Sequence, residues 1–316
     1  MRSSKAGRCV TIQLIKRTIK EWLDDNASRL AAALAFYTIL SIPPLLVLLS
    51  MIVAQFAGQQ QAQQAIIQQA QKWLVVDAVD AIRTILEAAT QPTNFSLAAI
   101  VSIAVLFFSA SGVFVHLQES LNSIWNVKPD PDEGIMNMVR KRIVSFVMIF
   151  LIALLFLLLL VASSVVGFLG NVLSQNLPGS WPVFRVLNFV LALVVLAGIF
   201  ALVYRTLPDA EIQWRDVALG AGVTAVLFLL GALIIGLFLN YSSPTSSYGA
   251  AGSIIALMLW IYYSAQVFFL GAEFTQVYAN MYGSHIRPEE GAVRVETVER
   301  TYRDNAVPAG QGQEAD

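Results

Sequence analysis

Long uncharged stretches interrupt the polar segments of this chain and predict its membrane-spanning helices. Apolar residues fill each stretch without the alternation of β-barrel strands, which indicates helices surrounded by lipid. Each stretch is about 20 to 28 residues long, enough for a helix to cross a hydrocarbon core of about 30 Å. The expected spans are residues 30–57, 95–117, 143–169, 183–204, 217–239 and 249–272. The predicted fold is an all-α integral membrane protein, a bundle of six transmembrane helices within residues 30–282.

Two segments outside these spans show apolar residues at helical spacing. In residues 1–29 they are accompanied by basic residues elsewhere around the helix; the set is Ile12, Ile15, Ile19 and Trp22 with Lys16, Arg17 and Lys20. This pattern predicts an amphipathic N-terminal helix, either lying on the inner leaflet or packed as an ordinary helix before the first span.

The second segment, residues 59–92, lies between the first two spans and contains Val75, Val79, Ile82, Leu86 and Ala89. It predicts one or two amphipathic helices on the outer face, acting as a lid or lipid-contacting shelf, or as a structural cap. After Gly283 the chain is charged and without periodicity, so residues 283–316 are predicted to be a disordered cytoplasmic tail.

The composition agrees with a membrane protein. Of the 316 residues, 57% are hydrophobic and 13% charged, against about 25% charged in soluble domains, and the mean hydropathy is +0.65. These values exclude a soluble enzyme and a disordered regulator. A net charge of −1 argues against a nucleic-acid partner.

The basic residues are distributed unevenly among the loops. Seventeen of the 20 Lys and Arg residues lie in the N-terminal segment, in the loops after spans two and four, or in the tail. By the positive-inside rule, both termini are expected in the cytoplasm. The first apolar run is too long for a cleaved signal peptide, so we expect it to be a retained anchor.

Proline interrupts the first span near its middle. Pro43 and Pro44 lack the N–H groups that would pair with the carbonyls of Ile39 and Leu40, so the pair should kink or break this helix. Ser41 or a water-lined cavity is a candidate partner for those carbonyls. One interpretation is a discontinuous helix on a substrate path; the other is a packing kink repaired by neighbouring helices.

Polar residues at the expected cytoplasmic end form the remaining candidate site. His116, Glu119 and Asn122 follow one another at i+3 spacing and predict either an interfacial hydrogen-bonded cluster or a relay for protons or head groups. Arg29 is a candidate ion-pair partner of Glu119 or Glu273.

Two further features are expected at the cytoplasmic ends of the spans. Arg205, after the fourth span, is typical of an interface anchor. Residues 25–28 (DNAS) supply N-cap chemistry for the first span.

Several motifs that would define an enzyme are absent from the sequence. There is no G-x-x-x-x-G-K-[ST] loop for an ATP-driven motor, no G-x-S-x-G elbow and no clustered set of metal ligands. We therefore expect no cofactor and no metal.

Four segments carry a family resemblance: DDNASRLAAALAFYTILSIPPLL (24–46), FFSASGVFVHLQESLNSIW (107–125), YRTLPDAEIQWRDVALGA (204–221) and SSYGAAGSIIALMLWIYYSAQVFFLGAEFTQVYA (246–279). Over residues 10–282 the chain resembles the YihY/BrkB family of bacterial inner-membrane proteins. The resemblance implies six spans, a Gram-negative-type inner membrane, and links to envelope integrity and serum resistance.

Three functional hypotheses follow. The leading one is a protein that moves or accommodates a lipid or other amphiphile without ATP, with membrane lipids as partners. The alternative is a structural or assembly factor that binds other envelope proteins. Members of the family have also carried the label ribonuclease BN, but a metal-dependent ribonuclease needs clustered His and Asp ligands and a cationic surface. We interpret that label as a misassignment and expect no enzymatic activity.

Overall fold

The structure is a computed structural model of the chain. It describes residues 2–74, 76–89, 105, 112–130, 151, 154–155, 158, 162–163, 165–167, 169–170, 181–242, 252–289 and 291–295. The predicted spans 95–117 and 143–169 lie mostly outside these residues.

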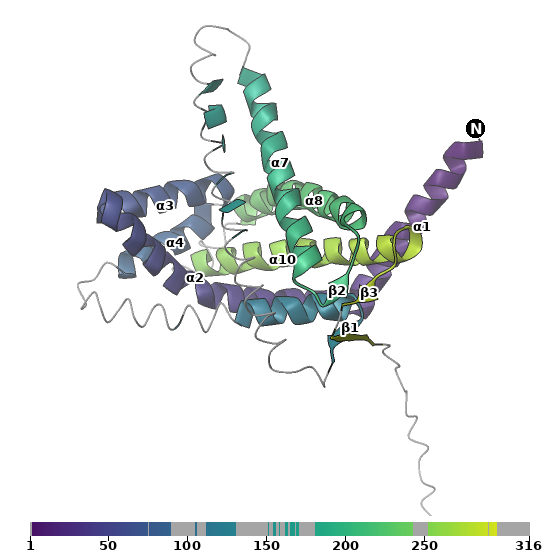
Figure 1. Cartoon of the computed structure of the whole chain (residues 1–316). Helices are drawn as coiled ribbons and strands as arrows, with labels where there is room; N and C mark the ends of the chain where they lie inside the picture. The colour runs from purple at the N-terminus through teal and green to yellow at the C-terminus, as the bar shows by residue number, and fades with distance from the viewer. Residues whose placement is uncertain are drawn as a thin grey trace, which may run out of the picture.

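The described part is predominantly helical (Figure 1). The helices are α1 (Arg2–Asp24), α2 (Ala27–Ala57), α3 (Gln59–Trp73), α4 (Val76–Ala89), α7 (Trp181–Thr206), α8 (Trp214–Ser242) and α10 (Gly252–Tyr282). Residues 112–124 are also helical. Four short strands complete the description: β1 (Val127–Pro129), β2 (Ala210–Glu211), β3 (Arg287–Pro288) and β4 (Ala292–Arg294).

Four of the described helices are long and apolar enough to cross a membrane. The candidate spans are Ala27–Gln55, Pro182–Thr206, Trp214–Phe238 and Gly252–Tyr282, which correspond to the predicted spans one, four, five and six. The sixth differs most, because α10 begins three residues later than predicted and continues ten residues further. Glu273, expected just after the span, therefore lies inside α10.

Of the two outcomes expected at the prolines, a kink or a break, the structure excludes the break, since α2 is one continuous 31-residue helix that contains both Pro43 and Pro44. Figure 1 shows that this helix changes direction along its length. The Ser41 hydroxyl donates a hydrogen bond to the carbonyl of Thr38 at 2.7 Å, so it does not serve the carbonyls of Ile39 and Leu40.

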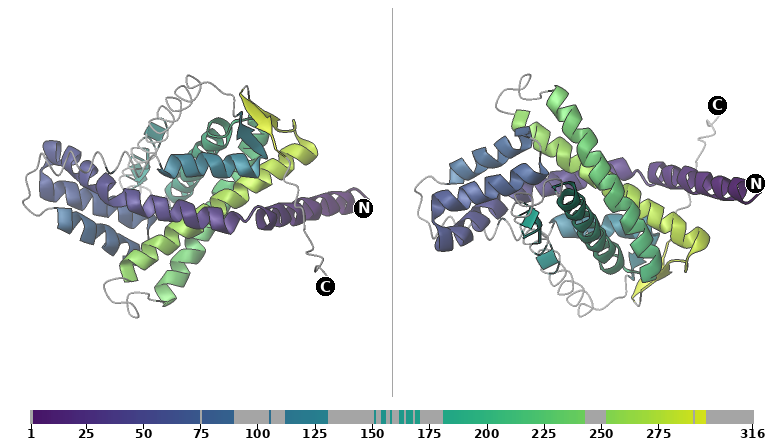
Figure 2. Two further views of the ribbon diagram at one scale, coloured as in Figure 1. Left: turned by 90° about the horizontal axis from the view of Figure 1, so that it is seen from below. Right: turned by 90° about the horizontal axis from the view of Figure 1, so that it is seen from above.

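Helices α3 and α4 form the segment between the first two spans; α3 packs against α2 and α4, and α4 packs against α2 and α10. Ile82 and Leu86 of α4 form a small apolar cluster with Leu46 of α2, just beyond the prolines. A second cluster joins Ala78 and Ala81 of α4 to Leu257 near the start of α10. Both views in Figure 2 place α3 and α4 at the opposite end of the molecule from α1 and the strands.

The main core lies toward the strand end and is made by residues of α2, residues 112–124, α7, α8 and α10. Its fully buried side chains include Leu121, Ile124, Tyr204, Val217 and Phe269. Because α8 packs against both α7 and α10, these three helices form the centre of the described bundle.

The short strands join loops that are distant in the sequence. Strand β1 pairs with β4 and β2 pairs with β3, both antiparallel. These pairs connect the polypeptide after residues 112–124 and after α7 to the segment after α10. The ordered strands β3 and β4 lie within residues 283–316, for which the sequence predicts disorder; that prediction is wrong here because each strand has a partner for its backbone N–H and C=O groups.

Candidate functional site

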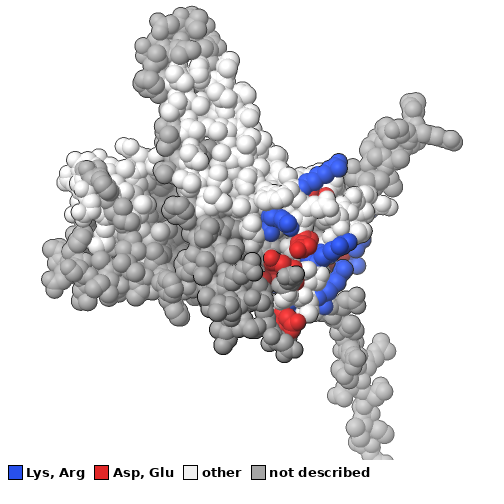
Figure 3. Space-filling view, viewed as in Figure 1, with Lys and Arg blue, Asp and Glu red and all other residues white. Residues whose placement is uncertain are grey.

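Many charged side chains lie at the strand end of the molecule, which we call the charged end; others, such as Asp80 and Arg83, lie on α4. Figure 3 shows Lys, Arg, Asp and Glu concentrated there, whereas the described surface of α7 and α8 farther away is white. The charged end contains the end of α1, the start of α2, residues 112–130, the ends of α7 and α10, the start of α8 and the four strands. All the predicted polar candidates except the α2 proline region lie within it.

His116 connects residues 112–124 to α2. Its Nε2 atom lies 3.0 Å from the carbonyl oxygen of Leu30 and must donate, because a carbonyl accepts hydrogen bonds. The imidazole also packs against the ring of Tyr37, with centroids 5.6 Å apart. The same tyrosine ring would lie 3.1 Å from a Cβ atom at Gly112, so the absence of a side chain there permits this close approach.

Asn122 makes a two-way connection to Asp209, which lies in the turn between α7 and β2. The Asn122 amide donates to Asp209 Oδ2 at 2.7 Å, and the backbone N–H of Asp209 donates to Asn122 Oδ1 at 2.8 Å. Both residues are buried. By contrast, Glu119 is exposed, so the three residues at i+3 spacing do not form one cluster.

Asp216 makes a similar connection between α8 and the end of α10. Its Oδ2 atom accepts hydrogen bonds from the backbone N–H of Ser284 at 2.8 Å and from the Ser284 hydroxyl at 2.9 Å. The carboxylate lies in the first turn of α8, where the helix dipole favours a negative charge. It also lies against Gly283, at which a Cβ atom would fall 2.6 Å from the Asp216 carboxyl carbon.

Helices α8 and α10 interlock through two reciprocal glycine–threonine contacts, which we call the Gly–Thr clasp. Thr275 of α10 occupies the space beside Gly220 of α8, and Thr224 of α8 occupies the space beside Gly271 of α10. Each threonine hydroxyl donates to the carbonyl of the glycine four residues earlier on its own helix, at 2.8 Å for Thr224 and 2.7 Å for Thr275. Small residues thus allow the two backbones to approach closely.

Tyr204 of α7 contacts both helices of the Gly–Thr clasp. Its hydroxyl donates to the carbonyl of Phe268 at 2.7 Å and lies 3.3 Å from the Thr224 hydroxyl. The ring is fully buried. One side chain therefore fixes α7 relative to both α8 and α10.

The predicted ion pair of Arg29 with Glu119 or Glu273 is wrong. Among the described residues, ion pairs join Arg17 to Glu21, Lys20 to Asp24 and Arg83 to Asp80. Arg29 is exposed, and packing of α1 on α10 brings a second carboxyl, that of Asp25, to Glu273.

Glu273 is completely buried, with 0% of its surface exposed. Neither of its carboxyl oxygens receives a hydrogen bond from an N–H or hydroxyl group of the described residues; the Asp25 carboxyl lies within hydrogen-bonding reach. Burial raises the pKa of Asp25 to about 6. The hydrogen bond to Glu273 opposes this rise, and the charges of Glu21 and Asp24 add to it.

The expected N-cap chemistry at residues 25–28 is also corrected. The N-cap residue of α2 is Asn26, which has a left-handed backbone (φ 53°) and makes no side-chain cap hydrogen bond. Its amide instead donates to the carbonyl of Asp24 at 3.2 Å. Asparagine tolerates this conformation better than most residues, so Asn26 forms a joint between α1 and α2.

The remaining predicted candidates are separate from the polar connections of the charged end. Pro43, Pro44 and Ser41 lie in the middle of α2 and contribute to the region that meets α4. Arg205 lies in the last turn of α7, where a cation is favoured by the helix dipole.

Sequence reasoning missed Asp209, Asp216 and Tyr204 as connecting residues. Each is polar at the end of an apolar run, which is a weak signal because such residues commonly contact water or lipid head groups. Their partners lie 20 to 87 positions away in the sequence, and no local pattern identifies them.

The charged end is thus a network of polar connections between helices. Among the described residues, no group of three or more His, Cys, Asp or Glu side chains is arranged to hold a metal ion. The four long apolar helices define the class: a polytopic helical membrane protein.

Comparison with known proteins places the chain within this class. Residues 18–296 match the family described as Virulence factor BrkB, and the chain belongs to that family. It is 27% identical over 275 residues to a UPF0761 membrane protein of Vibrio campbellii, covering 84% of this chain and 82% of the relative. A UPF0761 membrane protein of Vibrio vulnificus is 26% identical over 301 residues, covering 92% and 88%.

A further relative is a UPF0761 membrane protein of Pseudomonas paraeruginosa, 26% identical over 267 residues, covering 83% of this chain and 61% of the relative. No solved structure matches the chain.

Proposed function

We propose that this protein accommodates or moves a lipid or other amphiphile across a bacterial inner membrane without using ATP. In this proposal it has six spans, contributes to envelope integrity and performs no enzymatic reaction. The observation that carries the proposal is the proline pair within the continuous helix α2.

The proline pair places polar backbone atoms in the middle of an apolar helix. Because Pro43 and Pro44 have no N–H, the carbonyls of Ile39 and Leu40 lack their usual donors within the helix. Nearby side chains Leu40 and Leu45 are each 49% exposed, so this part of α2 has an apolar outer surface. Hydrogen-bond acceptors at such a depth favour a ligand that has both a polar group and apolar chains.

The proline region of α2 packs against α4 on one side and is exposed on another. Pro44 is buried, and Leu46 packs against Ile82 and Leu86 of α4. Helix α4 therefore supports the bend in α2 while Leu45 on another side remains available to lipid. We propose that α3 and α4 form a shelf beside the path of the amphiphile.

The exposed surface of helix α1 supports the proposal that this helix lies on the inner leaflet. Leu14 and Thr18 are buried, whereas Ile12, Ile15, Ile19 and Leu23 are between 49% and 60% exposed. Apolar side chains next to lysines and arginines are typical of helices that lie at the surface of anionic membranes. This placement would put the charged end and both termini in the cytoplasm, which reporter fusions to each terminus would test.

A flux assay with the purified full chain in liposomes tests the proposal. We expect movement of a fluorescent phospholipid without ATP, and a several-fold slower rate for Pro43→Ala/Pro44→Ala because the two carbonyls regain donors. Pro182→Ala is the matched control, since Pro182 occupies the first turn of α7, where proline removes no helical hydrogen bond. Absence of flux in the wild type, or equal flux in the double variant, contradicts the proposal.

A second assay distinguishes the other hypotheses. Crosslinking that recovers a stoichiometric envelope protein, together with no lipid flux, would favour an assembly factor. Incubation of the pure protein with RNA and divalent metal ions is expected to give no cleavage; metal-dependent cleavage by pure material would contradict the non-enzymatic proposal.

A further inference from the structure

Two carboxyl groups from different helices face each other at the charged end. Glu273 belongs to the membrane-spanning helix α10, and Asp25 belongs to the two-residue joint between α1 and α2. Glu273 is fully buried, and the two carboxyls lie within hydrogen-bonding reach of each other. Two ionised carboxylates in such contact would repel one another strongly, and neither could donate a hydrogen bond.

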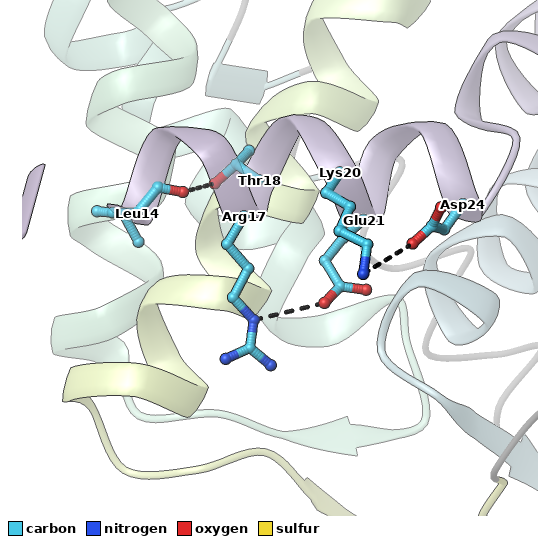
Figure 4. Close-up of polar contacts among 6 residues, drawn as sticks. All are labelled: Leu14, Arg17, Thr18, Lys20, Glu21 and Asp24. Carbon is cyan, nitrogen blue, oxygen red and sulfur yellow. Dashed lines mark hydrogen bonds and ion pairs between the residues drawn. The ribbon is translucent and has the colours of Figure 1, made fainter. Parts of the chain in front are cut away.

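No cation among the described residues neutralises this pair. On α1, Arg17 pairs with Glu21 at 3.4 Å and Lys20 pairs with Asp24 at 3.9 Å, both near the surface (Figure 4). Glu21 and Asp24 themselves add negative charge near Asp25.

The other helices that pack on α10 do not supply a cation either. In the first turns of α2 and α8, Arg29 and Arg215 are exposed and Asp216 is bonded to Ser284. Helix α4 packs against α10 near Leu257, far along the helix from Glu273. Within the part of the chain that the structure describes, a proton is therefore the positive species left to neutralise the carboxyl pair.

A proton fits this site better than a metal ion does. The described residues hold no group of three or more side chains arranged for a metal, whereas a carboxylic acid and a carboxylate need one proton to form a strong hydrogen bond. We propose that Asp25 and Glu273 form a proton-binding site, in which one proton shared at neutral pH keeps α1 docked on α10. This inference goes beyond the proposed amphiphile function and does not depend on it.

The surrounding structure makes α1 able to respond to this proton. Helix α1 packs against α10, and Leu14 and Thr18 of α1 are buried. It is joined to α2 at Asn26, whose left-handed conformation separates the two helices. Loss of the shared proton would place two adjacent negative charges between α1 and α10, and α1 would move away about this joint.

Infrared spectroscopy of the purified full chain tests the shared proton directly. At neutral pH the wild type should show the C=O stretch of a protonated carboxyl. Glu273→Gln should abolish this band, and Asp25→Asn should shift it, because the acid would then bond to a neutral amide. Glu211→Gln is the matched control: this glutamate is exposed on β2 of the same end and its loss should change nothing. Absence of the band, or a band unaffected by both substitutions, overturns the proposal.

Distance measurements between two spin labels test the movement of α1. Cys9 is the single cysteine, so a Cys9→Ser protein can carry labels at Gln13→Cys and Tyr282→Cys, both at exposed positions. The distance should lengthen or broaden from about pH 6 to about pH 9 in this background, and should stay constant when Glu273→Gln is added. A distance that is independent of pH without Glu273→Gln, or one that still changes with pH in its presence, overturns the proposal. Neither measurement depends on lipid flux. Failure of the shared-proton proposal can therefore be distinguished from failure of the proposed amphiphile function.

Discussion

Replacing Gly220 by alanine adds one methyl group inside the Gly–Thr clasp between α8 and α10. The new Cβ atom would lie 2.8 Å from the Cβ atom of Thr275, with the threonine hydroxyl closer still. Carbon atoms pack best at about 3.5–4.0 Å, so the helices would have to separate by roughly 1 Å or Thr275 would have to change rotamer. A rotamer change would break the hydrogen bond from Thr275 to the Gly271 carbonyl.

The expected magnitude follows from these two costs. Overpacking of this kind costs about 1–3 kcal/mol, and loss of the hydroxyl bond adds about 1 kcal/mol. Alanine regains up to about 1 kcal/mol through its greater helix propensity. We therefore expect Gly220→Ala to lower the free energy of unfolding by about 2 kcal/mol, and Gly271→Ala to behave in the same way because its Cβ would meet Thr224.

Gly222 provides the matched control, because it lies on the same helix and a Cβ atom there would meet nothing within 4 Å. Gly222→Ala should be neutral or stabilising by up to about 1 kcal/mol. The assay is unfolding in mixed SDS and detergent micelles, followed by circular dichroism. Thr275→Ala combined with Gly220→Ala should recover part of the loss, because the hydroxyl and methyl groups in conflict are removed. Equal effects of Gly220→Ala and Gly222→Ala would refute the close approach of α8 and α10.

Three further predictions concern the polar connections of the charged end. The pKa of Asp25 is raised from 3.8 to about 6. The contribution of this carboxyl to stability is therefore full below about pH 4 and is lost as the pH rises through about 6. The Tm in detergent should fall over this interval, and Asp25→Asn should flatten the dependence of Tm on pH. Asn122→Ala leaves the buried Asp209 carboxylate and N–H without these partners and should cost about 2–3 kcal/mol in SDS unfolding, whereas a cost below about 0.5 kcal/mol would contradict the pairing. Ser284→Ala removes one of the two hydrogen bonds to Asp216 and should cost about 1 kcal/mol by the same assay; a larger loss in Asp216→Ala is expected, and the reverse order would contradict the assignment.

The membrane class and the approximate positions of four described spans were predictable from the sequence. Hydropathy is a local property, summed over about 20 neighbouring residues, and lipid imposes the same requirement on every spanning helix. The position of the charged residues beyond or near the ends of the apolar helices was predictable for a related reason, since ionised groups are excluded from hydrocarbon wherever they occur in the chain.

Sequence alone predicted the partners of the polar residues poorly. His116 and Asn122 were recognisable as candidates, yet their separate connections to Leu30 and Asp209 depend on how residues 112–124 pack between α2 and the end of α7. Glu273 was expected to pair with a cation, and its contact with Asp25 arises because α1 packs against α10. No periodicity in the sequence specifies that contact.

The same distinction applies to the helices themselves. The sequence determined that α8 and α10 are apolar and long enough to span a membrane, and it showed small residues along them. The tertiary structure decided which glycine receives which threonine, and that β3 and β4 are ordered where the local sequence predicts disorder. Burial in lipid follows from composition, but interlocking and strand pairing require surfaces distant in the chain to fit one another, and this fit exists only in the folded protein.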